Sequence, residues 1–152
     1  MSRKVKIRFR LSGNPVASET VWAEQVGDNL YRLLNVPYYA MGYAEGDIVR
    51  CTDHDGGEEV VNVERHSGNG TIRIHFSSNP EGPKAQQVLD ELVSVGCTFE
   101  RASSRLVAVS VPANAEVPFS QLCNYLNKIG EDVITGWEIG KNPLSPETVQ
   151  SP

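Results

Sequence analysis

The sequence has few cysteines and none of the spacings that accompany metal or disulfide frameworks. Its 152 residues contain three, Cys51, Cys97 and Cys123. The odd number and the lack of a C-x-x-C pair argue against a disulfide scaffold and against a structural zinc site. They favour a reducing compartment. We therefore expect a cytoplasmic protein in which the three thiols act as small apolar fillers.

Long apolar runs are also missing. No stretch approaches the roughly 20 residues that a membrane-spanning helix needs, and the start, MSRKVKIRFRLSG, lacks the apolar segment of a signal peptide. We expect neither a secretory signal nor a membrane partner. A hydrophobic fraction of 39% with 22% charged residues is typical of a globular protein. The length suits one ordinary domain or two small units that share a core.

The familiar catalytic and nucleotide-binding motifs are absent as well. The sequence contains no G-x-S-x-G, no phosphate loop and no dinucleotide fingerprint. Ser67, in His66-Ser67-Gly68, has no evident carboxylate to orient the histidine beside it. The sequence therefore favours a non-enzymatic protein without catalytic residues, metal or cofactor.

Charge is distributed unevenly along the chain. The first ten residues hold five of the 14 Lys and Arg residues and no acid, which leaves nine bases against 19 acids in the remainder. An acidic body repels nucleic acid and suits a basic protein partner. The basic row Lys4, Lys6, Arg8 and Arg10 is expected to face solvent and discourage edge-to-edge pairing. Binding of phosphate or of an acidic partner is the alternative for this row.

The first half of the sequence has the alternation of β-strands. From Lys4 to Leu11, apolar and basic residues alternate without a break, which predicts a half-buried strand. Hairpin turns are expected at Asp55-Gly56-Gly57 and Ser67–Gly70, where residues with positive φ are easily accommodated. Further strands are predicted at Thr20–Val26, Leu30–Leu34, Asp47–Thr52, Glu59–Arg65 and Thr71–Phe76. Residues 1–70 are thus expected to form an antiparallel β meander or small barrel.

The second half changes to helical periodicity. Apolar stripes predict helices over Lys84–Val95 and Pro118–Ile129, with Gly96 and Gly130 as their stops. Strands are predicted at Cys97–Ala102, Arg105–Val111 and Val133–Ile139. Counted from Thr71, the order β-α-β-β-α-β predicts a ferredoxin-like sandwich over residues 71–140. The fold class is then α+β, with the two parts joined through a shared strand and residues 141–152 as a flexible tail.

A distinctive string of residues runs through both parts. Its members are Trp22, Glu24, Gly27, Leu30, Tyr31, Asn35, Pro37, Tyr38, Gly46, Asp47, Val49, Ser67, Gly68 and Asn69. This string resembles a bacterial family of uncharacterised proteins, domain of unknown function 4265, over roughly residues 20 to 140. The resemblance implies a bacterial cytoplasmic protein and a loose association with accessory or toxin-linked genes. It implies no activity, substrate or catalytic residue.

Two clusters are candidate partner-binding sites. Tyr38, Tyr39 and Tyr43 lie around Met41-Gly42, and aromatic residues with a polar group favour protein interfaces. Their alternative role is to cap the open end of the β half. The second cluster, Asp53-His54-Asp55, precedes Gly56-Gly57. Here the alternative is a solvated hairpin tip, although Asp53 and Asp55 could meet while His54 points away.

Three functional hypotheses follow from these candidates. The leading one is a non-enzymatic, immunity-type protein that neutralises a basic toxin or effector. The second is an enzyme or small-ligand sensor with a pocket between the halves, where His54, His66 or His75 would act. In it, His66 and His75 could face each other across a hairpin and titrate near neutral pH. Nucleic-acid binding is disfavoured, because the predicted central strands lack paired aromatics.

Overall fold

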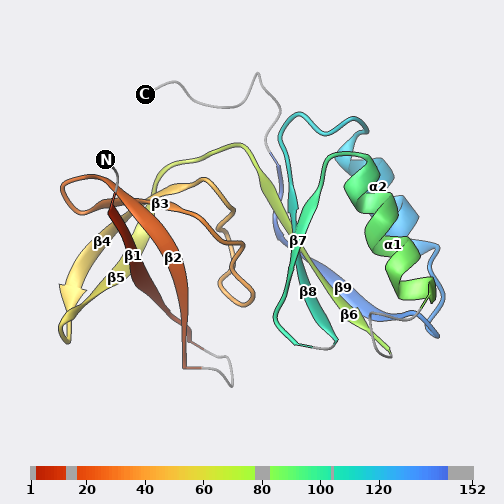
Figure 1. The fold of residues 1–152 in the computed structure, drawn as a ribbon, viewed down its shortest axis with the longest axis horizontal. Helices are drawn as coiled ribbons and strands as arrows, with labels where there is room; N and C mark the ends of the chain where they lie inside the picture. The colour runs from red at the N-terminus through yellow and green to blue at the C-terminus, as the bar shows by residue number, and fades with distance from the viewer. Residues whose placement is uncertain (1–2, 13–16, 78–82, 104, 144–152) are drawn as a thin grey trace.

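The computed structural model describes residues 3–12, 17–77, 83–103 and 105–143. The fold is α+β and mostly strands, as predicted. A closed five-stranded barrel stands beside a four-stranded sheet that carries two helices (Figure 1). In the described part of the chain, no helix has both the length and the apolar character needed to cross a membrane.

The barrel is an up-and-down meander. Its strands are β1 (Arg3–Arg10), β2 (Ser18–Gly27), β3 (Leu30–Leu33), β4 (Ile48–His54) and β5 (Gly57–Arg65). With an odd number of strands, the first and last run in the same direction, so β1 closes the barrel by parallel pairing with β5 at Ile7↔Glu58 and Arg8↔Glu59. The basic row faces solvent at Lys4, Lys6 and Arg10, as predicted. Because β1 is paired on both sides at Ile7 and Arg8, the row does not protect a free sheet edge there, contrary to the prediction.

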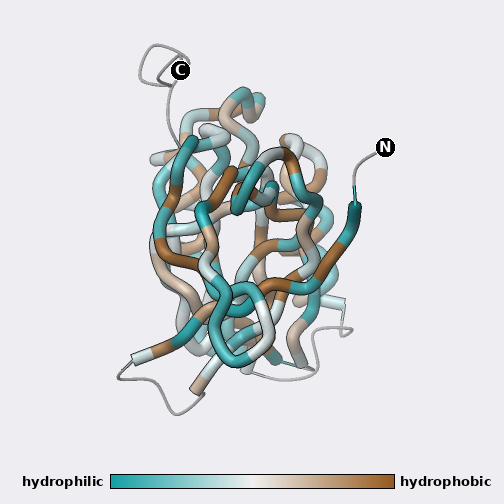
Figure 2. Tube along the Cα trace, turned by 90° about the vertical axis from the view of Figure 1, so that its left-hand side faces the viewer, coloured by the Kyte–Doolittle hydropathy of each residue, from teal (hydrophilic) through white to brown (hydrophobic). Residues whose placement is uncertain are grey.

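Alternation places one face of each strand inside the barrel. The buried cluster comprises Ile7, Phe9, Val21, Ala23, Tyr31, Leu33, Ala40, Val49 and Cys51. Figure 2 views the molecule from the barrel side and shows hydrophobic and hydrophilic segments alternating along the chain. The Asp55-Gly56 turn between β4 and β5 has φ values of 54° and 79°, which is the backbone of a tight hairpin turn and matches the prediction.

The second sheet consists of β6 (Gly70–Phe76), β7 (Thr98–Arg101), β8 (Leu106–Val111) and β9 (Ile134–Lys141). Its order is β7-β8-β6-β9, and every neighbouring pair is antiparallel. Helices α1 (Pro83–Ser94) and α2 (Phe119–Asn127) lie together beside this sheet, on the side away from the barrel (Figure 1). They bury apolar stripes that include Leu89, Leu92, Leu122 and Leu126 in a second core, separate from that of the barrel.

The connection between the two parts differs from the prediction. Ser67–Gly70 is not a hairpin turn, because it leads from β5 of the barrel to β6 of the other sheet. No strand among the described residues is shared. The reason lies in pairing: β4 and β1 occupy the two edges of β5, whereas β6 pairs with β8 and β9.

The C-terminal strand is longer than predicted. It extends to Lys141, which pairs with Thr71, so the tail expected from residue 141 does not begin there. Residues 144–152 of that expected tail lie outside the described residues.

Candidate functional site

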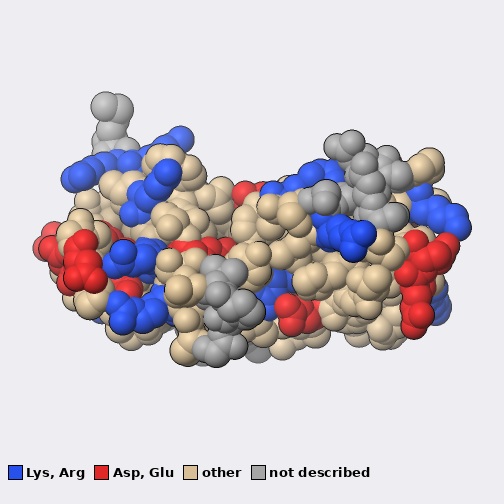
Figure 3. All heavy atoms as spheres, turned by 90° about the horizontal axis from the view of Figure 1, so that it is seen from below, with Lys and Arg blue, Asp and Glu red and all other residues tan. Residues whose placement is uncertain are grey.

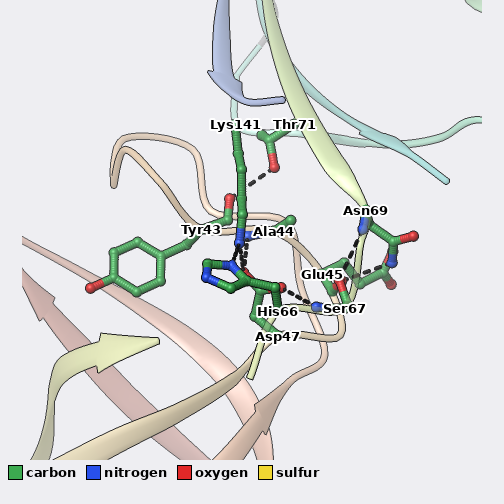
Figure 4. A network of polar contacts seen from close by, with 9 residues as sticks. All are labelled: Tyr43, Ala44, Glu45, Asp47, His66, Ser67, Asn69, Thr71 and Lys141. Atoms are coloured by element: carbon green, nitrogen blue, oxygen red, sulfur yellow. Dashed lines mark hydrogen bonds and ion pairs between the residues drawn. The ribbon is translucent and has the colours of Figure 1, made fainter. Parts of the chain in front are cut away.

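The two parts meet at a polar junction centred on Asp47 (Figure 4). Asp47 follows the loop between β3 and β4 and is fully buried. Its Oδ2 accepts hydrogen bonds from the Ala44 backbone N–H at 2.9 Å and from Lys141 Nζ at 2.6 Å. Its Oδ1 accepts from the Ser67 N–H at 2.8 Å. A buried carboxylate needs such partners, and here they come from three separate segments.

Lys141 connects this carboxylate to His66. Its side chain is 10% exposed, and Nζ also donates to Nδ1 of the His66 ring at 2.7 Å. An ammonium group can only donate, so this contact suits the ring tautomer whose Nδ1 carries no proton. The side chain of Lys141 thereby joins β9 to the β3–β4 loop and to the linker, residues 66–69 between β5 and β6 (Figure 4).

The linker adds a second set of contacts. Asn69 Nδ2 and Ser67 Oγ both donate to the Glu45 carbonyl at 2.9 Å, and Asn69 Oδ1 accepts from Ala113 at 3.2 Å. Gly46 permits this approach, because it has φ +87° and a Cβ there would lie 3.1 Å from that of Ser67. Gly46-Asp47 and Ser67-Gly68-Asn69 therefore hold the two parts together.

Two further carboxylates fix the remainder of the β3–β4 loop. Glu19, buried inside the end of β2, accepts from the backbone N–H groups of Tyr38, Tyr39 and Ala40 at 2.5–3.0 Å. Glu100 of β7 accepts from the Val36 N–H at 2.8 Å. The sequence analysis missed both residues. Glu19 could have been found, because it shares the inward face of β2 with Val21 and Ala23, where an acid is unexpected.

The three predicted tyrosines lie in this loop, but the loop rests against the second sheet. Tyr38 donates its hydroxyl to the Arg101 carbonyl at 3.0 Å, and Tyr43 packs edge-on against Phe9 with ring centroids 4.7 Å apart. Burial raises the pKa of both phenols. The packing of Tyr43 corresponds to the alternative role, closure of the barrel end. Tyr38 and Tyr39 remain partly exposed.

The predicted Asp53-His54-Asp55 cluster lies elsewhere. Figure 1 places the β4–β5 turn on the side of the barrel away from the second sheet. Contrary to the prediction, His54 does not point away: its Nε2 lies 3.3 Å from Asp55 Oδ2 and 2.5 Å from Arg10 Nη2. The described residues contain no group of three or more His, Cys, Asp and Glu side chains placed to hold a metal ion. The tyrosines and these acids thus belong to two separate regions.

The two histidines expected to face each other are apart as well. His66 belongs to the junction, whereas His75 is exposed on β6, opposite Leu106 and Gly136 of the neighbouring strands. They do not bracket a hairpin, because β5 and β6 lie in different sheets.

Two hollows flank the loop at Tyr39 and Met41, which line both. The barrel-side hollow has a volume of about 380 Å³. Its lining is Phe9, Arg10, Leu11, Ser12, Tyr39, Ala40, Met41, Tyr43, Val60 and Val61. The sheet-side hollow has a volume of about 290 Å³. Its lining is Tyr38, Tyr39, Met41, Arg73, His75, Leu106 and Glu138. We call the two together the junction groove.

The exposed rim of the junction groove is apolar in part. Met41 is 55% and Val61 is 54% exposed, and both line the barrel-side hollow. The two side chains thus add exposed apolar surface to the edge of this hollow.

Comparison with known proteins identifies the family. The model of a domain of unknown function (DUF4265) matches residues 19–137. The chain belongs to this family. The resemblance found in the sequence is thereby confirmed. Of its residues, Asp47, Ser67 and Asn69 belong to the junction, and Asn35 and Tyr38 join the β3–β4 loop to β7.

One solved structure has the same fold. It is described as a novel crystal structure of a hypothetical protein from Neisseria gonorrhoeae. The likeness covers 95% of this chain and 98% of that chain, with a TM-score of 0.76 and 20% sequence identity. At this identity the likeness concerns the fold alone. No curated protein matches the chain.

Proposed function

We propose that the protein is a non-enzymatic binding module that engages a partner protein through the junction groove. The observation that carries the proposal is the pair of exposed apolar side chains, Met41 and Val61, beside a hollow lined by Phe9, Tyr39 and Tyr43. Binding energy in protein interfaces concentrates on a few aromatic and apolar anchors set in such pockets. Glu19 supports the groove, because it fixes the backbone of the loop that carries Tyr39.

The partner that we propose is a basic toxin or effector, which the protein would neutralise by covering it. The support is the net charge of −5 and the exposed acids Asp53 and Asp55 at the β4–β5 turn. Opposite charge accelerates association and is screened over about 8–10 Å at physiological salt. Figure 3 shows acidic and basic groups next to each other at the barrel end. We expect the net negative charge to steer the encounter and the groove to supply the affinity.

The test is affinity capture of the partner from the source organism, followed by reconstitution with the purified partner. Tyr39→Ala and Met41→Asp should weaken binding at least tenfold, the effect of losing about 1.4 kcal/mol or more at an anchor. Val93→Asp is the matched control, because Val93 is 48% exposed on α1, away from the groove. Asp55→Lys should chiefly slow association and reduce its salt dependence.

The proposal is rejected if no protein binds stoichiometrically, or if Val93→Asp weakens binding as much as Met41→Asp. The immunity role requires more: the purified partner must lose its toxic activity when an equimolar amount of this protein is added.

Two finer assignments are also proposals. We propose that β6 to β9 with α1 and α2 form a ferredoxin-like sandwich; the support is the order β7-β8-β6-β9 with a helix in each crossover. We propose a bacterial, cytoplasmic location, supported by three free cysteines. Fractionation of the source organism tests the location, and an experimental structure classified by topology tests the sandwich.

A further inference from the structure

The sheet-side hollow contains a buried guanidinium group. Arg73 lies on β6 between Thr71 and His75, and its side chain is 4% exposed. Nη1 donates to the Tyr38 carbonyl at 2.7 Å. This bond anchors the side chain under the barrel loop and leaves the edge formed by Nε and Nη2 for other partners.

The partners on that edge are poor ones for a guanidinium. Nη2 contacts the thioether sulfur of Met41, which is a weak acceptor. Nε lies 3.1 Å from Oε1 of Glu138, an ion pair, yet in the described structure this buried nitrogen makes no hydrogen bond. Glu138 is directly opposite Arg73 on β9. Glu138 therefore balances the positive charge of Arg73, but its carboxylate is not aligned to accept two parallel N–H···O bonds from the guanidinium.

The groups that cover this edge are exposed to solvent. The Glu138 side chain is 51% exposed and Met41 is 55% exposed, so each can rotate outward without leaving a core. Tyr38, Tyr39 and Leu106 would remain as walls of the hollow. Its volume of about 290 Å³ corresponds to about ten water molecules at the liquid's roughly 30 Å³ each.

We propose that this hollow binds a small monocarboxylate with an aromatic or aliphatic body. The carboxylate would take two hydrogen bonds from Nε and Nη2 of Arg73, the geometry that a guanidinium fork prefers. The body would pack against Tyr39 and Leu106. Glu138 occupies the position of the ligand's carboxylate when the ligand is absent, and it must turn outward when the ligand binds. This inference goes beyond the proposed protein contact, because it requires no protein partner.

Glu138 gives the proposal a directional test. If Glu138 competes with the ligand for Arg73, removing its charge must strengthen carboxylate binding. A residue that merely supported the pocket would weaken binding when changed. Glu138→Gln keeps the shape of the side chain, and Glu131→Gln is the matched control, because Glu131 is an exposed acid that does not line the hollow.

The experiment is an NMR titration of the full chain with benzoate, with benzamide as the uncharged probe of equal shape. Benzoate should give saturable shifts at Met41 and Tyr39, and benzamide should not. Glu138→Gln should bind benzoate about two- to fivefold more tightly, the effect of removing an exposed like charge. Arg73→Gln should abolish binding. If Arg73→Gln does not fold, the benzoate affinities of Glu138→Gln and Glu131→Gln still test whether Glu138 competes with the ligand.

The proposal is overturned by any of three results. These are no saturable response to benzoate, an equal response to benzamide, and a Glu138→Gln variant that binds no more tightly than Glu131→Gln.

Discussion

The two most buried thiols belong to different cores. Cys51 lies inside the barrel and Cys97 under the helices of the second sheet. Burial raises the pKa of Cys51 from 9.0 to about 12 and that of Cys97 from 9.0 to about 11. Since the thiolate is the reactive form, neither residue is suited to nucleophilic chemistry, and both fill space as the sequence suggested.

Alkaline pH should therefore destabilise the fold. A thiol whose pKa is raised in the folded state makes its full contribution to stability below the pKa of the unfolded chain, near 9.0. This contribution is lost as the pH rises toward the folded pKa, about 11 for Cys97 and about 12 for Cys51. Denaturant melts between pH 8 and 11 should show a falling free energy of unfolding. Cys51→Ala should flatten that slope, and an unchanged slope would contradict the assignment.

A single glycine fixes the approach of the C-terminal strand to β6. A Cβ on Gly70 would lie 2.6 Å from Pro143 Cδ and 2.8 Å from the Lys141 carbonyl oxygen. We expect Gly70→Ala to cost about 1–3 kcal/mol of unfolding free energy by overpacking. Gly57→Ala is the control, because its Cβ would have no neighbour within 4 Å. Chemical denaturation compares the two, and equal midpoints would refute the steric argument.

The helices are held by leucines on their inner stripes. Leu92 of α1 and Leu126 of α2 are each 1% exposed. Replacing either by Ala should cost about 2–5 kcal/mol, because a buried side chain is lost and a cavity remains. Gln86→Ala, at a half-buried position of α1, and Lys128→Ala, at the exposed residue that follows α2, should change stability by less than about 0.5 kcal/mol. If both leucine variants melted like the parent, the helix orientation would be wrong.

The sequence predicts most of the individual strands and helices, because the residue patterns that indicate them are local. Alternation in β1 and the stripes of α1 and α2 each lie within a dozen residues, and the elements form close to the expected bounds. A small barrel is one of the two forms expected for residues 1–70, but the parallel pairing of β1 with β5 that closes it, and the docking of Tyr38 on Arg101, could not be predicted. Both join residues about fifty or more positions apart, and no local period encodes such contacts. For the same reason, the predicted site residues fell into two regions.

The ion pair between Asp47 and Lys141 links the barrel to the second sheet. Because Asp47 is fully buried, Asp47→Asn would leave Lys141, which is 10% exposed, without its counter-charge. We expect a loss of about 3–5 kcal/mol, as for other broken buried pairs. A calorimetric melt should also show whether barrel and sheet, which have separate cores, then unfold in two transitions. Asp132→Asn, which breaks an exposed pair with Lys84, should have little effect.

The double variant Asp47→Asn with Lys141→Met tests whether the cost arises from the unpaired charge. The double variant should lose clearly less unfolding free energy than the two single variants lose together, because neither charge is then left without its partner. Strict additivity would contradict a direct ion pair.

The position of this pair along the chain has a consequence for synthesis. Asp47 and Lys141 are 94 residues apart, and Lys141 ends the last strand. At about 5–20 residues per second, the ribosome delivers Lys141 roughly 5–20 s after Asp47. All five barrel strands are made before Lys141, so during this interval the carboxylate that must end up buried lacks its cation. We expect the nascent barrel to keep its β3–β4 loop open to water until Lys141 has been synthesised.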